Sequence, residues 1–418
     1  MAVLNTAPVN TVAASAKRSR ALVVTGYLTL CATVGMIAGI CALLERAEIL
    51  PPELASRVTV FHPYAMLLFV GVPAFLGLFG RLFLPLALNA SEARGLPKLD
   101  GVALTFLLTS LTVFLTGVAG HASVGLGLAL WSVGAVLVAC VTLATILDVR
   151  AGAGIVLPRG QMHQKPTVAP FSVFVWTQLC AAFGLLLVAP VIAAAATKSL
   201  LGYSVTMPAF ELPVSLIILV AATGLATRVF DAVAPLGANA RKAAVCVGAL
   251  ATIGGSTVWA HATVTHEVQS TVVAVEMGLA VLVSMTFAAI WGRALWCAKA
   301  ALSVPVLWMS GFFILLVAGW ISSGIHTAVL NGAVFAMFGG FYSWLDDVTG
   351  SRYSRRAAQV QFLLMFVGVI LGASASGLLQ AVGGAMMVSS LLVLASILFS
   401  LLRRNEPASA RVLQEIRR

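Results

Sequence analysis

The sequence predicts an all-α integral membrane protein with about twelve transmembrane helices. Hydrophobic residues make up 60% of the 418 positions, charged residues make up only 9%, and the mean hydropathy is +1.03. Soluble domains of this length carry far more charge. Apolar runs of roughly 20 residues, each long enough to cross the hydrocarbon core of a bilayer as a helix, follow one another almost without a break. We therefore expect no soluble domain and only two short tails.

Each predicted span is one of these apolar runs. The first follows a basic stretch that ends at Arg20, and it is too long for the apolar core of a signal peptide. The expected organisation is a cytoplasmic tail at 1–20, a membrane domain at 21–403 and a second cytoplasmic tail at 404–418. The predicted spans are 21–44, 60–88, 102–120, 124–149, 168–196, 208–230, 242–261, 268–292, 303–322, 325–345, 358–380 and 383–402.

The basic residues gather in alternate loops between these spans. With a cytoplasmic N-terminus, the inner loops hold Arg94, Lys98, Arg150, Arg159, Lys165, Arg241, Lys242, Arg293, Lys299, Arg352, Arg355 and Arg356. The outer loops keep mainly Arg57 and Lys198. An excess of Lys and Arg marks the cytoplasmic side, so we expect both termini in the cytoplasm and the chain in the inner membrane of a bacterium. The same distribution accounts for the net charge of +11 and argues against a nucleic-acid partner.

His62 and His326 stand 264 positions apart, each at the start of a long apolar run. In the predicted topology both open their spans from the outer face, where three other histidines also fall: His121, His261 and His266. An imidazole at membrane depth costs free energy unless it binds or hydrogen-bonds to something, so it is a candidate functional residue. Two facing histidines would supply both axial ligands of a low-spin haem iron.

The cysteines restrict the kind of haem. All six are scattered through apolar runs, and neither Cys-x-x-Cys nor Cys-x-x-Cys-His occurs. This spacing argues against iron–sulfur ligation and against a covalently attached c-type haem. Buried thiols that pack as small hydrophobic groups are the simpler interpretation. We therefore expect any haem in this chain to be bound without covalent thioether links, as haems of type a and type b are.

Several stretches, in order along the chain, resemble subunit I of the haem–copper respiratory oxidases, which holds a low-spin haem, a high-spin haem and copper. The second span keeps that family's His-Gly-x-x-Met-x-Phe-Phe-x-x-x-Pro pattern from His62 through Met66 to Pro73, and 77–86 follows its Gly-Phe-Gly-Asn and Val-Pro-Leu. Further matching stretches are 147–152, 169–176, 185–193, 331–344 and 361–371. The resemblance runs from about Ala21 to Leu402 and implies a bundle like that of oxidase subunit I.

The resemblance also implies roles for three residues. His62 matches the family's first low-spin haem ligand, and His326 matches the second. Arg46, in Leu-Leu-Glu-Arg-Ala-Glu, resembles the first-helix arginine that lies against this haem. The implied cofactor is one bis-histidine haem near the outer face.

The dioxygen-reducing centre of the family lacks its counterparts. Gly324 stands where the high-spin haem has its proximal histidine, and 211–215 replaces His-Pro-Glu-Val-Tyr. The copper pair of Trp-Ala-His-His reads Trp-Ala-His-Ala at 259–262, so His261 alone remains of three copper ligands, and we expect no copper. His261 could be a relic, a propionate partner or, with His266, a ligand of another group. The eighth span has Glu276 instead of the family's lysine.

These features together predict a membrane electron-transfer subunit of a respiratory complex, without catalysis of its own. Two imidazoles saturate the iron, so electron transfer is expected and dioxygen binding is not. We expect other membrane or periplasmic redox subunits as partners in a hetero-oligomer, with quinol or cytochrome c as exchange partners. Two alternatives stay open: a noncanonical terminal oxidase or nitric-oxide reductase subunit, and a haem-free structural or assembly subunit. Fold resemblance cannot choose between them.

Overall fold

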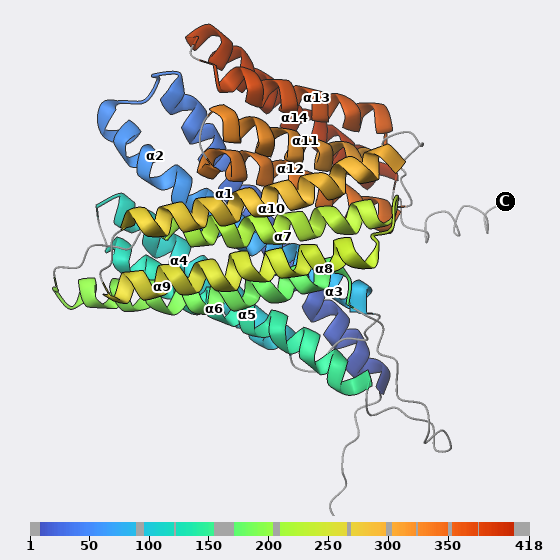
Figure 1. Ribbon diagram of the computed structural model, residues 1–418. Helices are drawn as coiled ribbons and strands as arrows, with labels where there is room; N and C mark the ends of the chain where they lie inside the picture. Colours follow the sequence, from blue (N-terminus) through green and yellow to red (C-terminus); the bar gives the residue numbers. More distant parts are fainter. Residues whose placement is uncertain are drawn as a thin grey trace, which may run out of the picture.

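The computed structural model describes residues 9–88, 96–120, 123–153, 171–203, 210–265, 269–297, 303–322, 325–349, 353–374 and 376–404. All secondary structure in this part of the chain is helical, and it forms twelve rods (Figure 1). Ten rods are single helices: α1 (Val9–Arg46), α4 (Leu96–Val118), α5 (Val124–Ala153), α6 (Val173–Leu200), α7 (Glu211–Asp231), α10 (Gln269–Cys297), α11 (Val304–Ser322), α12 (Ile325–Thr349), α13 (Arg355–Gly372) and α14 (Gly377–Arg404).

The other two rods are composite. The first joins α2 (Pro52–Tyr64), the π-helical segments η1 (Ala65–Gly71) and η2 (Pro73–Leu78), and α3 (Phe79–Leu88). The second joins α8 (Ala238–Ala249), the π-helical segment η3 (Leu250–Gly254) and α9 (Gly255–Thr265). Ten rods of the described chain are long and apolar enough to cross a membrane. The prediction of an all-α multi-pass membrane protein is confirmed.

Helix boundaries differ from the predicted spans at several places. The second rod begins at Pro52 rather than near residue 60, because proline suits the first turn of a helix, where its missing N–H leaves no bond unmade. The helix α1 begins at Val9, twelve residues before its apolar segment Ala21–Glu45. Hydropathy marks the apolar part of a helix and not its polar extensions, so these ends could not be read from the apolar pattern.

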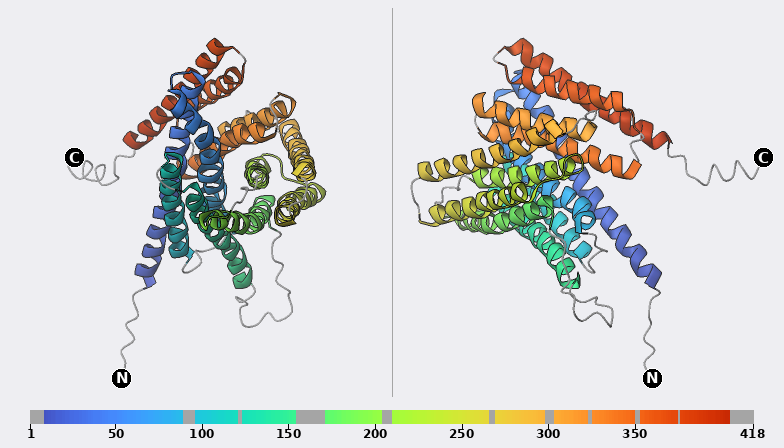
Figure 2. Two further views of the ribbon diagram at one scale, coloured as in Figure 1. Left: turned by 90° about the vertical axis from the view of Figure 1, so that its left-hand side faces the viewer. Right: turned by 45° about the vertical axis from the view of Figure 1, so that its right-hand side comes forward.

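The Pro52–Leu88 rod and α7 form the centre of the bundle, and both are buried along nearly all of their apolar length. The left view of Figure 2 shows α6, α8 to α10 and the α11–α12 pair in an arc with α7 inside it. The α13–α14 pair lies outside this arc, with α13 packed against α11 and α14 beside α1.

The π-helical segments of the central rod begin near two prolines: η1 starts two residues after Pro63, and η2 starts at Pro73. Proline cannot donate a backbone hydrogen bond, so the regular ladder is interrupted where each occurs. π-helical turns are often found at functional sites. In this chain the first of them begins three residues after His62.

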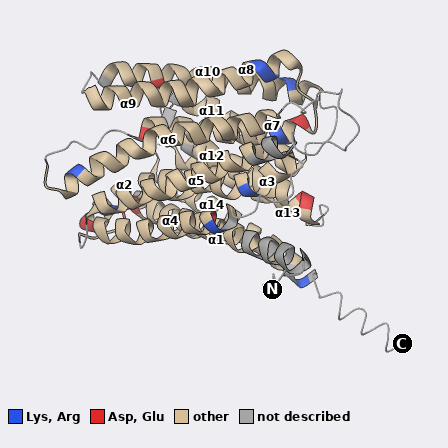
Figure 3. Ribbon diagram, turned by 90° about the horizontal axis from the view of Figure 1, so that it is seen from below, with Lys and Arg blue, Asp and Glu red and all other residues tan. Residues whose placement is uncertain are grey.

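Charge is distributed unevenly between the two ends of the bundle. Figure 3 shows most of the described Lys and Arg residues at the end where α8 begins, and this helix carries Arg241 and Lys242. Arg293 near the end of α10 and Arg228 near the end of α7 belong to the same end. This distribution agrees with the sign of the charge bias expected from the loops.

Candidate functional site

His62 lies in the last turn of α2 and is half-buried against α1. Its Nδ1–H donates a hydrogen bond to the backbone carbonyl of Ala38, with 2.9 Å between the two atoms. This bond fixes the ring orientation and places the hydrogen on Nδ1, which leaves the lone pair of Nε2 for a ligand. Metal-binding histidines show the same arrangement, because a backbone carbonyl that accepts from one ring nitrogen makes the other a better donor to the metal.

Tyr64, two residues further on, ties this end of α2 to the start of α7. Its ring packs against Phe210 with centroids 5.4 Å apart and against Phe114 with centroids 6.0 Å apart. Its hydroxyl donates a hydrogen bond to the carboxylate of Glu211, the first residue of α7. The His62 end of the central rod therefore lies beside the first turn of α7.

The start of α12 lies at this same end of the bundle. Val329 of α12 lines a small cavity together with Leu212 and Ser215 from the first two turns of α7. His326 lies three residues before Val329, in the first turn of α12, but its side chain is outside the described part of the structure. The backbone therefore brings His62 and His326 to one end of the bundle.

Arg46 is the last residue of α1, and its side chain is also outside the described part. Its neighbour Glu45 accepts a hydrogen bond from the hydroxyl of Thr59 on α2, with 2.5 Å between the oxygens. Two contacts, at Glu45 and at Ala38, thus hold the end of α1 against the helix that carries His62. The backbone of Arg46 lies at the same end of the bundle as the two histidines.

His261 lies on α9, in the second composite rod, and not on the rod that carries His62. Its side chain is exposed on α9, whereas its neighbours Trp259 and Ala262 are buried. No three His, Cys, Asp or Glu side chains of the described residues form a group that could hold a metal ion. Three other candidate residues from the sequence lie outside the described chain: His121, His266 and Gly324.

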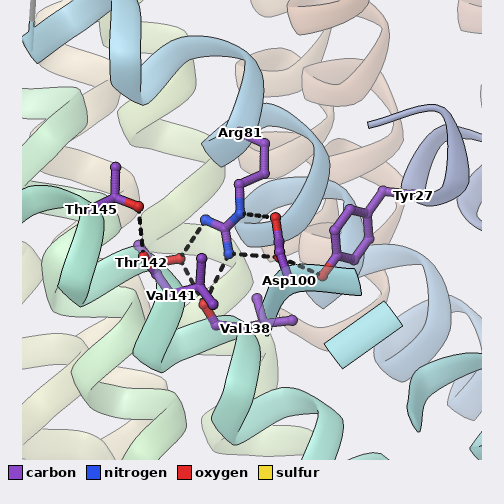
Figure 4. Close-up of polar contacts among 7 residues, drawn as sticks. All are labelled: Tyr27, Arg81, Asp100, Val138, Val141, Thr142 and Thr145. Carbon is purple, nitrogen blue, oxygen red and sulfur yellow. Dashed lines mark hydrogen bonds and ion pairs between the residues drawn. The ribbon is translucent and has the colours of Figure 1, made fainter. Parts of the chain in front are cut away.

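Sequence reasoning passed over one buried polar cluster at the opposite end of the central rod, centred on Arg81 (Figure 4). Its Nε donates to Oδ2 of Asp100 at 2.6 Å and its Nη2 to Oδ1 at 3.2 Å. Nη1 donates to the hydroxyl of Thr142 at 3.0 Å, and Nη2 donates also to the carbonyl of Val138 at 3.2 Å. The hydroxyl of Tyr27 donates to Oδ1 of Asp100 at 3.1 Å.

The Arg81 cluster joins helices α1, α3, α4 and α5 through one ion pair. A bidentate arginine–carboxylate pair has well-defined geometry, and two further guanidinium hydrogens find acceptors on α5. Its sequence signal was a single arginine inside an apolar span, which is uncommon enough to indicate a buried partner. The arrangement is that of a structural anchor.

Comparison with known proteins agrees with the fold. No family model matches the chain. It is 26% identical over 386 residues to cytochrome c oxidase subunit 1 of Cereibacter sphaeroides, covering 73% of this chain and 64% of the relative. It is 23% identical over 400 residues to cytochrome c oxidase subunit 1 of Yarrowia lipolytica, covering 78% of this chain and 72% of the relative.

The chain shows distant homology to cytochrome c oxidase subunit 1. The chain spans 64% of the length of the bacterial relative. The homology extends over most of this chain and supports the same helical architecture. The low identity leaves room for different residues at the metal sites, so function must be argued from the residues themselves.

Proposed function

We propose that this chain is a membrane electron-transfer subunit that holds one low-spin haem between His62 and His326. The observation that supports it most directly is the hydrogen bond from Nδ1 of His62 to the carbonyl of Ala38. It fits the donor chemistry of an axial ligand, because it leaves Nε2 for the iron. His326 would supply the second bond and Arg46 would lie beside the haem. When bound, such a haem supplies a one-electron redox couple.

The proposed subunit lacks the dioxygen chemistry of the oxidases that it resembles. Ser215 lies in the second turn of α7, where the resemblance aligns the tyrosine of the oxidase centre, and Ala262 is buried where it aligns a copper-binding histidine. The serine hydroxyl lacks the phenol ring of that tyrosine, and the methyl group of alanine cannot replace an imidazole ligand of copper. Gly324, at the position aligned with the high-spin ligand, has no side chain to donate. We therefore expect one haem and no copper.

We place the chain in the bacterial cytoplasmic membrane with both termini in the cytoplasm. The charge bias in Figure 3 supports this orientation, since the end of the bundle that is rich in Lys and Arg would face inward. His62 then lies toward the outer face. The electron donor or acceptor would be another redox subunit above this end, with quinol or cytochrome c as the exchange partner. Native mass measurement after gentle detergent extraction tests this hetero-oligomer.

A pyridine haemochrome assay and metal analysis of the purified protein test the function. One haem per chain and no copper is the expected result. Two metal centres would contradict the proposal in favour of a noncanonical terminal oxidase or nitric-oxide reductase. No haem at all would contradict it in favour of a structural or assembly subunit. A carbon monoxide difference spectrum adds an independent check, because a six-coordinate haem with two histidines should bind carbon monoxide only weakly.

A further inference from the structure

Glu276 is buried without a hydrogen-bond partner among the described residues, and it has no role in the proposed haem site. It lies seven residues after the start of α10 and is only 2% exposed. Within the described chain, neither of its carboxylate oxygens has a hydrogen-bond partner. An ionised carboxylate without donors is strongly disfavoured at such a position, and ionisable residues inside a membrane bundle are usually functional. The side chain of Glu276 is therefore a candidate for binding a proton or another ligand.

The carboxylate of Glu276 borders a small cavity between α7, α10 and α12. The cavity has about 10 Å³ open to the centre of a water molecule, which is space for roughly one water. Ser215 of α7 is the second lining residue with a polar side chain, and the others are leucine, methionine, alanine and valine side chains. A single water in this space could bridge the serine hydroxyl and the carboxyl group.

The chemistry of the lining favours a proton over a metal cation as the ligand. Sodium, calcium and magnesium ions are held by several oxygen donors, and this lining offers only one carboxyl and one hydroxyl group. One proton converts the carboxylate to a neutral acid, whose O–H can then donate to the bridging water. No other reactant is needed, and the buried charge disappears.

A route for protons to this site begins at the first residue of α7. Glu211 and Ser215 are four residues apart on α7, so their side chains lie on the same face about one turn from each other. Glu211 is half-buried and holds the hydrogen bond from Tyr64. It therefore lies between this end of the bundle and Ser215 of the cavity lining.

Most other charged groups on the helices around the cavity lie more than one turn, along their own helix, from any residue that lines it. The titratable or charged residues on the helices around it are Glu211, Arg228 and Asp231 on α7, Arg241, Lys242 and Cys246 on α8, His261 on α9, Arg293 and Cys297 on α10, and His326, Tyr342, Asp346 and Asp347 on α12. Only Glu211 and His326 lie within one turn of a lining residue. Arg293 lies about 25 Å from Glu276 along α10.

We propose that Glu276 is a proton-binding site inside the bundle, where it holds one proton as a neutral carboxylic acid, bridges to Ser215 through one water and exchanges the proton by way of Glu211. The site does not depend on a bound haem. Its ligand is a proton, with one water as the carrier.

Infrared spectroscopy of the purified full-length protein tests this directly. At neutral pH the wild type should show the carbonyl stretching band of a protonated carboxylic acid, shifted in D₂O. The band should disappear in Glu276→Gln and remain in Glu53→Gln, which changes an exposed glutamate in the first turn of α2. A wild-type spectrum without the band, or the same band in Glu276→Gln, would overturn the proposal. If Glu276→Gln does not fold, Glu276→Asp takes its place in the test and should shift the position of the band.

The exchange route is tested by the rate at which the band shifts after transfer to D₂O. Ser215→Ala and Glu211→Gln should both keep the acid band and slow its shift several-fold. An unchanged rate in both variants would contradict the route. Normal haem content in Glu276→Gln would leave the haem proposal intact, so the two proposals can fail separately.

Discussion

The two ends of the Pro52–Leu88 rod use buried polar groups in different ways. At one end Arg81 makes four hydrogen bonds, to Asp100, Thr142 and Val138, and all three guanidinium nitrogens are used. At the other end the single described hydrogen bond of His62 goes from Nδ1 to Ala38, and Nε2 stays available. The hydrogen bonds of Arg81 fix helices to one another, whereas His62 keeps a nitrogen lone pair on Nε2 for a metal. A buried polar group whose hydrogen bonds are all made indicates a structural role. One that keeps an unused lone pair indicates a ligand-binding role.

Breaking the Arg81 end should have the largest effect on stability. Arg81→Leu leaves the carboxylate of Asp100 buried without its ion-pair partner, which should destabilise the protein by about 3–5 kcal/mol. Thermal unfolding in detergent, followed by circular dichroism, measures this.

The matched control is the double variant Arg81→Leu with Asp100→Leu, which removes both charges and should recover most of the lost stability. A double variant as unstable as the single one would show that the pair is not the anchor.

Removing a contact in the middle of the Pro52–Leu88 rod should destabilise the protein less than Arg81→Leu does. The indole N–H of Trp131 on α5 donates to the carbonyl of Leu68 in η1, with 2.9 Å between the atoms, and the ring is fully buried. Trp131→Phe removes this bond and part of the ring, and should destabilise the protein by about 1–3 kcal/mol. The melting temperature should fall by less than in Arg81→Leu. An equal or larger fall would contradict the ranking of the two contacts.

A smaller, pH-dependent effect is expected at Tyr353, between α12 and α13. Burial raises the pKa of its phenol above the usual value of 10, and the neighbouring Asp346 carboxylate raises it further. Above pH 10 the unfolded chain releases this proton while the folded chain keeps it, so the folded state binds more protons and loses stability as pH rises. Melting curves of Tyr353→Phe should lack this alkaline loss. If the melting temperatures of Tyr353→Phe and the wild type fell in parallel above pH 10, Tyr353 would not be the source of the alkaline loss of stability.

The sequence predicted the membrane class and the approximate spans because those follow from long apolar runs. It did not predict the Arg81 cluster, since Asp100 and Tyr27 come from other helices and only packing brings them to Arg81. Glu276 stood out in the sequence as a mid-span carboxyl, but its lack of partners and its shared cavity with Ser215 required coordinates. The anchor of His62 on Ala38 is equally a product of packing, because no motif encodes a backbone acceptor 24 residues away.

The central claim is that His62 and His326 hold one low-spin haem, and it is tested most directly by a reduced-minus-oxidised absorbance spectrum of purified variants. His62→Ala and His326→Ala each remove one axial bond, so both should lose the low-spin Soret and alpha bands. His261→Ala changes an exposed histidine on α9 and should leave both bands in place. A His62→Ala protein with normal haem content and an unchanged low-spin spectrum would contradict the account.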